Sequence, residues 1–271
     1  MKTFAEGNIL KMKTLLEDVV QYKLPIGHEE IEMNKFIGQR IKLSFNGQIN
    51  CIATGEKIKK SYNQGYSYKA FMTLARCDLC IVKPELCHYH KGTCREPKWG
   101  EENCFQPHII YLAISSGVKV GITREKQVPT RWMDQGAIKA LPILKVESRR
   151  DAGMIETAMK EQVSDRTNWR KMLQDSTPEK VEDLVAIREG LFESYADLID
   201  DYNGEDIDEN IVEINYPVES YPQKITSLGF DKNPEIQGEL QGIKGQYLIF
   251  DTGVVNIRKH QGYWLKLESE E

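Results

Sequence analysis

The chain has 271 residues, of which 28% are charged, and a formal net charge of −5 at neutral pH. This length suits one large domain or two to three small ones with a substantial buried core. No run approaches the roughly 20 apolar residues of a membrane-spanning helix, and the N-terminus lacks the uninterrupted apolar region of a secretory signal. The composition therefore excludes a membrane protein of that kind and predicts a globular, cytoplasmic protein.

Charge is unevenly distributed along the chain. Residues 51–150 contain 17 Lys and Arg against 9 Asp and Glu, whereas residues 178–213 contain 13 acids against two basic residues. This asymmetry predicts a basic binding face in the middle of the chain, backed by an acidic helical segment. Ordinary solvated surfaces of unequal sign are the alternative.

Residues 1–50 are predicted to form a β-rich segment. Within them, "RIKLSFNGQINC" alternates apolar and polar residues on both sides of Asn46-Gly47. This dipeptide is the strongest short sequence signal for a two-residue hairpin turn. We therefore expect a β-hairpin that reverses direction at Asn46-Gly47.

Residues 51–106 form an irregular segment that holds all six cysteines, five of them within 28 residues. Without an export signal, a metal site is favoured over disulfides. Tetrahedral Zn²⁺ takes four sulfur or nitrogen donors, and both thiolates of a Cys-x2-Cys pair can bind one ion. A set of free thiols without a metal is the alternative. The predicted ligands are Cys77, Cys80, Cys87 and Cys94, with Cys104 or His90 as replacements for the last.

Four protein ligands leave no open position on the ion, so this site is predicted to be structural. The same segment carries a second, incomplete pattern. Cys51 stands three residues before Thr54, and Ser67 stands three residues before Ala70. With cysteine at positions 54, 67 and 70, this spacing would be that of a zinc ribbon.

Residues 107–175 alternate strand and helix patterns. The stretch "IYLAISSGVKVGIT" alternates strictly around a Ser-Ser-Gly turn, which predicts a two-stranded hairpin. Because successive side chains point to opposite faces, one face is apolar core. It carries Ile110, Leu112, Ile114, Val118, Val120 and Ile122. The other face carries Tyr111, Ala113, Lys119, Gly121 and Thr123, where the small residues leave space above the tyrosine and the lysine.

A short helix is expected to begin near Pro129 and to end at Gly136. It places Arg131 and Gln135 one turn apart on one face. The stretch "LPILKVESRRD" then supplies a third strand.

A longer helix follows in "SRRDAGMIETAMKEQV", where Ser148 and Asp151 are arranged like a capping box. Glu156 stands at the edge of the apolar stripe of this helix.

Residues 176–206 are predicted to be an acidic helix and a linker. The helix covers about residues 178–202, with Thr177 as a cap and Pro178 in its first turn. The polar stretch "DDYNGEDIDEN" is interpreted as the linker.

Residues 207–271 form a second β-rich segment. Its stretch "GQYLIFDTGVVN" echoes "GQRIKLSFNGQIN" near the N-terminus when one residue is gapped. We therefore expect related hairpins at the two ends, joined in one small sheet or barrel. Chance similarity between hairpins is the alternative.

The order of the predicted elements in residues 107–175 resembles that of the GIY-YIG nuclease superfamily. "IIY" stands where its Gly-Ile-Tyr lies and "KVG" where its Tyr-Ile-Gly lies, while Arg131 and Glu156 match its helical arginine and its metal-binding glutamate. Over residues 7–265 the chain resembles more closely an uncharacterised bacterial family, domain-of-unknown-function family 2797. The matching phrases are "CHYHKGTCREPKWG", "YLAISSGVKVGITR", "PTRWMDQGA" and "GIKGQYLIFDTGVVNIR".

The resemblance implies an α+β fold. A small three-stranded antiparallel sheet with helices lies at its centre, a zinc-binding module precedes it, and β-rich segments flank both. Members of the second family typically carry a zinc ribbon where this chain has Thr54, Ser67 and Ala70. The first ribbon is therefore interpreted as lost and metal-free, and the site that begins at Cys77 as kept.

The resemblance also implies roles for four residues on one cleft, whose small residues would make room for a phosphate. Glu156 would hold Mg²⁺ or Mn²⁺, Arg131 would bind the phosphate with two hydrogen bonds, and Tyr111 would orient or deprotonate water. Lys119 replaces the second tyrosine of the superfamily. It can act as a base only if its pKa falls well below about 10.4, and otherwise it is a phosphate clamp.

The resulting prediction is a metal-dependent endonuclease that hydrolyses the phosphodiester bonds of DNA or RNA. The alternative is a non-catalytic, zinc-containing DNA- or RNA-binding protein on a degenerate nuclease scaffold, and a structural or protein-binding role is a weaker third. Taken singly, each site residue also has an ordinary explanation as a half-buried tyrosine or a charge on a helix surface.

Overall fold

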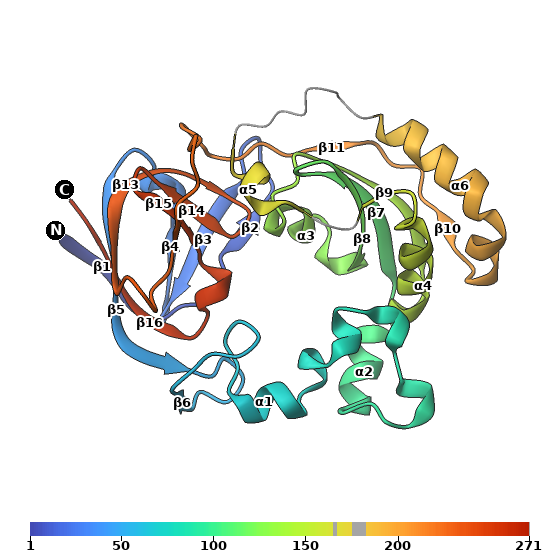
Figure 1. Ribbon diagram of the computed structural model, residues 1–271, viewed down its shortest axis with the longest axis horizontal. Coiled ribbons are helices and arrows are strands. Elements are labelled where there is room, and N and C mark those ends of the chain that lie inside the picture. The colour runs from blue at the N-terminus through green and yellow to red at the C-terminus, as the bar shows by residue number, and fades with distance from the viewer. Residues whose placement is uncertain (165–166, 175–182, 271) are drawn as a thin grey trace.

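A sheet built from both ends of the chain forms one side of the molecule (Figure 1). The computed structural model describes residues 1–164, 167–174 and 183–270. In this sheet the strand order is β1-β16-β5-β13-β14-β15-β12, and β6 also pairs with β5. The bounds are β1 (Lys2–Asn8), β5 (Arg40–Asn50), β6 (Lys57–Ile58), β12 (Ser227–Leu228), β13 (Glu235–Lys244), β14 (Tyr247–Phe250), β15 (Gly253–Asn256) and β16 (Tyr263–Ser269). The expectation that the two ends join in one sheet is confirmed.

The expected hairpin at Asn46-Gly47 is wrong. Strand β5 continues straight through this dipeptide, and Gly47 has a φ of +87°. Phe45 lies opposite Leu265 and Ile49 opposite Tyr263, so the dipeptide forms an irregularity in the pairing of β5 with β16. The local turn signal is absorbed as a bulge, because β16 offers a partner along the whole strand. The echoing C-terminal stretch does form a hairpin, between β14 and β15.

A small three-stranded sheet covers part of the terminal sheet. It consists of β2 (Lys13–Leu15), β3 (Gln21–Ile26) and β4 (Glu29–Glu32), and the short helix η1 (Asn34–Phe36) follows it. Tyr22, Leu24 and Ile26 of β3 are buried in the same core as Ile41 and Leu43 of β5. This sheet therefore belongs to the terminal unit of the fold.

The central sheet lies on the other side of the molecule (Figure 1). Its three antiparallel strands are those predicted, β7 (His108–Ile114), β8 (Val118–Arg124) and β9 (Lys139–Val146). Two short strands, β10 (Glu205–Asp206) and β11 (Val212–Glu213), pair with β9. Part of the stretch predicted as a linker, β10, therefore extends this sheet instead, because β9 offers it an open edge, and β11 follows in the segment predicted to be β-rich.

The helices beside this sheet follow the sequence signals where the structure describes them. Their bounds are η6 (Glu125–Gln127), α3 (Thr130–Asp134), α4 (Arg149–Met159), α5 (Trp169–Met172) and α6 (Leu184–Asp201). Ser148 caps α4, since its Oγ accepts a hydrogen bond from the Asp151 amide. Asp183 caps α6, and the predicted cap Thr177 and Pro178 lie outside the described residues.

Both faces of the central hairpin are buried. Ile110, Leu112 and Val120 pack with Ile155 of α4 and Leu191 of α6, as predicted for the apolar face. On the opposite face, Tyr111 and Ala113 join the core of the terminal unit. The face expected to be the open floor of a cleft is therefore partly covered by that unit.

The cysteine-rich segment connects the terminal unit to the central sheet at the bottom of Figure 1. It contains α1 (Tyr68–Thr73), η2 (Ala75–Cys77), η3 (Leu79–Ile81), η4 (Pro84–Leu86), η5 (Tyr89–Lys91) and α2 (Pro97–Cys104). Helix η4 lies directly on α4, since a Cβ added at Gly153 would stand 2.5 Å from the Pro84 Cβ. Glycine at this position permits the close approach.

The short helix η7 (Arg258–His260) leads from β15 to β16 and completes the described elements. Within the described parts of the chain, none of the helices combines the length and apolar character that crossing a membrane requires.

Candidate functional site

A large cleft opens where the cysteine-rich segment, the central sheet and the terminal unit meet. Its volume is about 760 Å³, and its lining comes from residues 63–84, from β8, α3 and α4, and from Arg258 of η7. These elements surround the middle of the view in Figure 1. Segments far apart in the sequence therefore contribute to one concave surface.

The lining of the cleft is strongly basic. Among the described residues, the acids on it are Asp78, which pairs with Arg95 at 2.6 Å, and Glu156, which pairs with Lys160 at 3.1 Å. Eight basic residues line it: Arg76, Arg95, Lys119, Arg124, Arg131, Arg149, Lys160 and Arg258. After these two pairs are formed, a clear excess of positive charge remains.

Several of these guanidinium groups are close together and partly desolvated. Burial lowers the pKa of Arg149, the Cys104 thiol opposes this shift, and the charges of Arg131 and Arg124 lower the pKa further. Burial and the charge of Arg131 likewise lower the pKa of Arg258, and the charge of Asp134 opposes this shift. Like charges held together in a partly buried site are relieved by an anion, so the cleft is arranged to attract one.

Tyr111 is the first of the predicted site residues. It stands directly opposite Gly121 in the β7–β8 pairing, and a Cβ at position 121 would lie 2.8 Å from its hydroxyl oxygen. The space beside the glycine is therefore filled by the tyrosine ring, not left for a phosphate as expected. Tyr111 is fully buried, and its hydroxyl donates to Gln135 Oε1 at 2.9 Å. Burial raises its pKa, partly offset by Arg131.

Lys119 shares the same acceptor. Its Nζ donates to Gln135 Oε1 at 2.6 Å and to Thr167 Oγ1 at 2.9 Å. Its side chain lines the cleft although the residue is only 3% exposed. Gln135 therefore ties Tyr111 and Lys119 together. The sequence put Gln135 on the same helical face as Arg131 but assigned it no role.

Arg131 and Glu156 complete the predicted constellation. Both act on the hydroxyl of Tyr111, since Arg131 lowers its pKa and Glu156 raises it. Arg131 comes from α3 and Glu156 from α4, and Glu156 is 8% exposed. All four predicted residues therefore gather at one end of the cleft. Sequence reasoning missed Gln135, Lys160 and Arg258 there, because their place depends on tertiary packing.

A second, smaller pocket lies within the cysteine-rich segment. Four of its lining residues are cysteines: Cys80, Cys87, Cys94 and Cys104. Cys77 lies elsewhere, on the wall of the basic cleft, and His90 is exposed outside the pocket. Burial, followed by Asp78 and the other three thiols, raises the pKa of Cys80 to about 12. The structure therefore brings together three of the four predicted ligands and the alternative Cys104.

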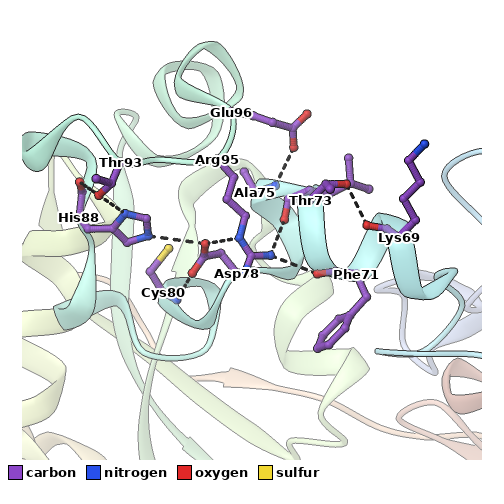
Figure 2. A network of polar contacts seen from close by, with 11 residues as sticks. Lys69, Phe71, Thr73, Ala75, Asp78, Cys80, His88, Thr93, Arg95 and Glu96 are labelled. Atoms are coloured by element: carbon purple, nitrogen blue, oxygen red, sulfur yellow. Dashed lines mark hydrogen bonds and ion pairs between the residues drawn. The ribbon is translucent and has the colours of Figure 1, made fainter.

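An adjacent group shares Cys80. One ligand atom each from Asp78, Cys80 and His88 lie within 4.8 Å of one another (Figure 2). The Asp78 carboxylate is already engaged by Arg95, and His88 Nδ1 lies 2.8 Å from Thr93 Oγ1. Four thiols are one of the donor sets of structural Zn²⁺, whereas among the described residues the mixed group is the one whose ligand atoms lie within 4.8 Å of one another.

The residues at the incomplete ribbon positions 51, 54, 67 and 70 take part in hydrogen bonds. Burial disfavours the Cys51 thiolate, but hydrogen bonds from Thr54 and from backbone amides outweigh this and lower its pKa to about 7. Ser67 accepts the Ala70 amide and caps α1. Of the four ribbon positions, only Cys51 offers a thiol.

The fold and the site together define an α+β protein with a basic central cleft beside a cysteine-lined pocket. The chain belongs to the family described as "Protein of unknown function (DUF2797)", whose model matches residues 38–265. This match includes the central sheet, the part of the terminal unit from residue 38 onward and every described residue that lines the cleft. No curated protein and no solved structure matches the chain.

Proposed function

We propose that the protein binds nucleic acid in the basic cleft, with the phosphate backbone along Arg124, Arg131 and Arg149. The observation that supports this is the charge of the lining, which has eight basic residues against two acids that are already paired. Positively charged grooves attract the backbone of nucleic acids and release its counterions.

The size of the cleft favours a polyanion over a single small anion. One phosphate is held by one or two arginines, whereas these cations are spread over the cysteine-rich segment, β8, α3, α4 and η7 across about 760 Å³. A ligand with several phosphates in a row engages more of them at once.

Binding without cleavage fits the geometry better than hydrolysis does. The hydroxyl of Tyr111 is buried and donates to Gln135, and the ammonium group of Lys119 donates to Gln135 and Thr167. Glu156 is engaged by Lys160. Each of these groups would have to give up a present contact before it could act as a base or as a metal ligand.

A GIY-YIG-type endonuclease is the second candidate, favoured by the convergence of Tyr111, Lys119, Arg131 and Glu156. In this case Glu156 would hold Mg²⁺ or Mn²⁺, an ion that would stabilise the charge that develops on the leaving oxygen. Arg131 would bind the phosphate, and Lys119 would act as a clamp.

We also propose that Cys80, Cys87, Cys94 and Cys104 bind one structural Zn²⁺. The donor chemistry supports this, because four half-buried cysteines line one pocket. The ion would stabilise the short helices of the cysteine-rich segment, which forms one wall of the cleft.

The test is a titration of the full chain with labelled DNA and RNA by fluorescence anisotropy, over a series of salt concentrations. Binding that weakens steeply with salt supports the proposal, and no binding at low salt contradicts it. The same oligonucleotides with Mg²⁺ or Mn²⁺ separate the two candidates. Cleavage that Glu156→Gln abolishes would favour the endonuclease.

A further inference from the structure

The cleft has an apolar side that phosphate binding does not explain. Among the described residues, exposed large hydrophobic side chains form two groups along the chain, one within residues 1–19 and one in the cysteine-rich segment between residues 68 and 86. Met72 is 49% exposed, Leu79 58% and Val82 77%, and all three line the cleft together with Phe71 and Ile81. A soluble surface rarely gathers such side chains at one place without a partner.

These residues are separate from most of the basic ones. The apolar wall, defined here as Phe71, Met72, Leu79, Ile81 and Val82, comes from the cysteine-rich segment at the bottom of Figure 1. The basic wall comes from the central sheet and the helices beside it, and it consists of Lys119, Arg124, Arg131, Arg149 and Lys160. The cleft therefore offers an apolar surface and a cationic surface to the same ligand.

From this pairing we propose that the ligand of the cleft is single-stranded nucleic acid, with its bases on the apolar wall and its phosphates on the basic wall. The inference rests on the proposed function and narrows it. Single strands expose the faces of their bases, and proteins hold them by combining a cationic groove with apolar contacts to those faces. A duplex hides its base faces by stacking and turns phosphates outward, so it would leave the apolar wall without a partner.

The charge of the cleft decides between a nucleic acid and an apolar peptide as the occupant. A peptide bound through the apolar wall alone would bring no phosphate to Arg124, Arg131 and Arg149, of which Arg124 and Arg131 each lower the pKa of Arg149 by their charge. A strand of phosphates offsets these charges while its bases cover the exposed side chains.

The experiment compares one labelled sequence as a single strand and as a duplex, each as DNA and as RNA, in anisotropy titrations with the full chain. We expect at least one single strand to bind about tenfold more tightly than the matching duplex. Equal or tighter duplex binding would overturn this inference and leave the proposed function standing. Binding of neither form would overturn both.

A matched pair of variants tests the apolar wall. Leu79→Ser removes an apolar side chain from the cleft, while Leu15→Ser removes an equally exposed leucine, also 58%, from β2 of the terminal unit. We expect Leu79→Ser to weaken single-strand binding by about threefold or more at every salt concentration. The slope against salt should stay the same, because no phosphate contact is lost.

Leu15→Ser should bind as the wild type does. If Leu79→Ser and Val82→Ser both also bind single strands as the wild type does, the bases do not contact the apolar wall and the inference is wrong. Because the side chains of Leu79 and Val82 are exposed, the folded state tolerates either change. Thermal unfolding of each variant verifies this.

Discussion

Gly121 of β8 lies so close beneath Tyr111 of β7 that a Cβ on the glycine would stand 2.8 Å from both Cζ and Oη of the tyrosine. The tyrosine has little room to move, because its ring packs on Trp132 at a centroid distance of 5.9 Å and its hydroxyl is bound to Gln135. The small residue on this face therefore serves the packing of the tyrosine. The packed tyrosine also fixes the position of Gln135 Oε1, which accepts hydrogen bonds from both Tyr111 and Lys119.

The first prediction concerns this contact. Gly121→Ala should destabilise the fold by about 1–3 kcal/mol, the usual cost of overpacking a buried site. Gly117→Ala in the hairpin turn is the matched control, since a Cβ there meets nothing within 4 Å. Urea denaturation of both variants measures the difference. A Gly121→Ala protein as stable as the Gly117→Ala protein would mean that the tyrosine can shift freely.

The second prediction concerns the cysteine pocket. Elemental analysis of the purified protein should find about one Zn²⁺ per chain. Cys104→Ser should lower the zinc content strongly, because its thiol faces the pocket. Cys77→Ser is the control and should retain the ion, since Cys77 lies on the wall of the cleft. The reverse result would restore the ligand set that the Cys-x2-Cys spacing suggested.

Removal of the metal should also destabilise the protein. A chelator is expected to lower the unfolding temperature of the wild type, because the ion would order helices that otherwise have a small apolar core. The Cys104→Ser protein should not respond to the chelator. An unchanged unfolding temperature in the wild type would argue that the thiols are free.

The fourth prediction concerns Arg131. Arg131→Ala should weaken nucleic-acid binding about tenfold or more, the scale of one charged hydrogen-bonded contact. The slope of binding against salt should become less steep by about 0.7 on a single strand. Arg40→Ala is the control, because Arg40 lies on the terminal sheet and pairs loosely with Glu270 at 3.7 Å. Equal effects of the two variants would indicate a general charge effect and not a contact in the cleft.

The fifth prediction is a pH dependence of stability set by His108. Burial lowers the pKa of His108 to about 4, opposed by a hydrogen bond to the Gln106 carbonyl and assisted by the charges of Arg149 and Arg124. The unfolded chain therefore binds the proton more readily. The buried, neutral histidine therefore contributes fully to the free energy of unfolding above about pH 6.5. This contribution is lost as the pH falls towards 4.

The loss amounts to roughly 3 kcal/mol for a shift of this size. His108→Leu removes the titrating group, so its free energy of unfolding should fall less than that of the wild type between pH 6.5 and 4. Denaturant titrations at several pH values compare the two. Parallel pH profiles would show that the histidine is not kept neutral by burial.

The sequence by itself determined the elements whose signals lie within a few neighbouring residues. Alternation around Ser-Ser-Gly predicted β7 and β8, Ser148 predicted the start of α4, and Gly136 predicted the end of α3. Such signals act through local hydrogen bonds and backbone angles, which each short stretch carries with it.

The tertiary structure alone decided how these elements pair and pack with one another. Asn46-Gly47 became a bulge because β16 supplied a longer pairing than a local turn could. Cys104 replaced Cys77 in the cysteine pocket because residues of α2 and η3 line the same pocket, an arrangement that ligand spacing does not encode. Arg258 likewise lines the cleft through tertiary packing that its neighbouring residues do not encode. Burial of apolar surface between distant segments sets these positions, and its free energy exists only once the chain is assembled.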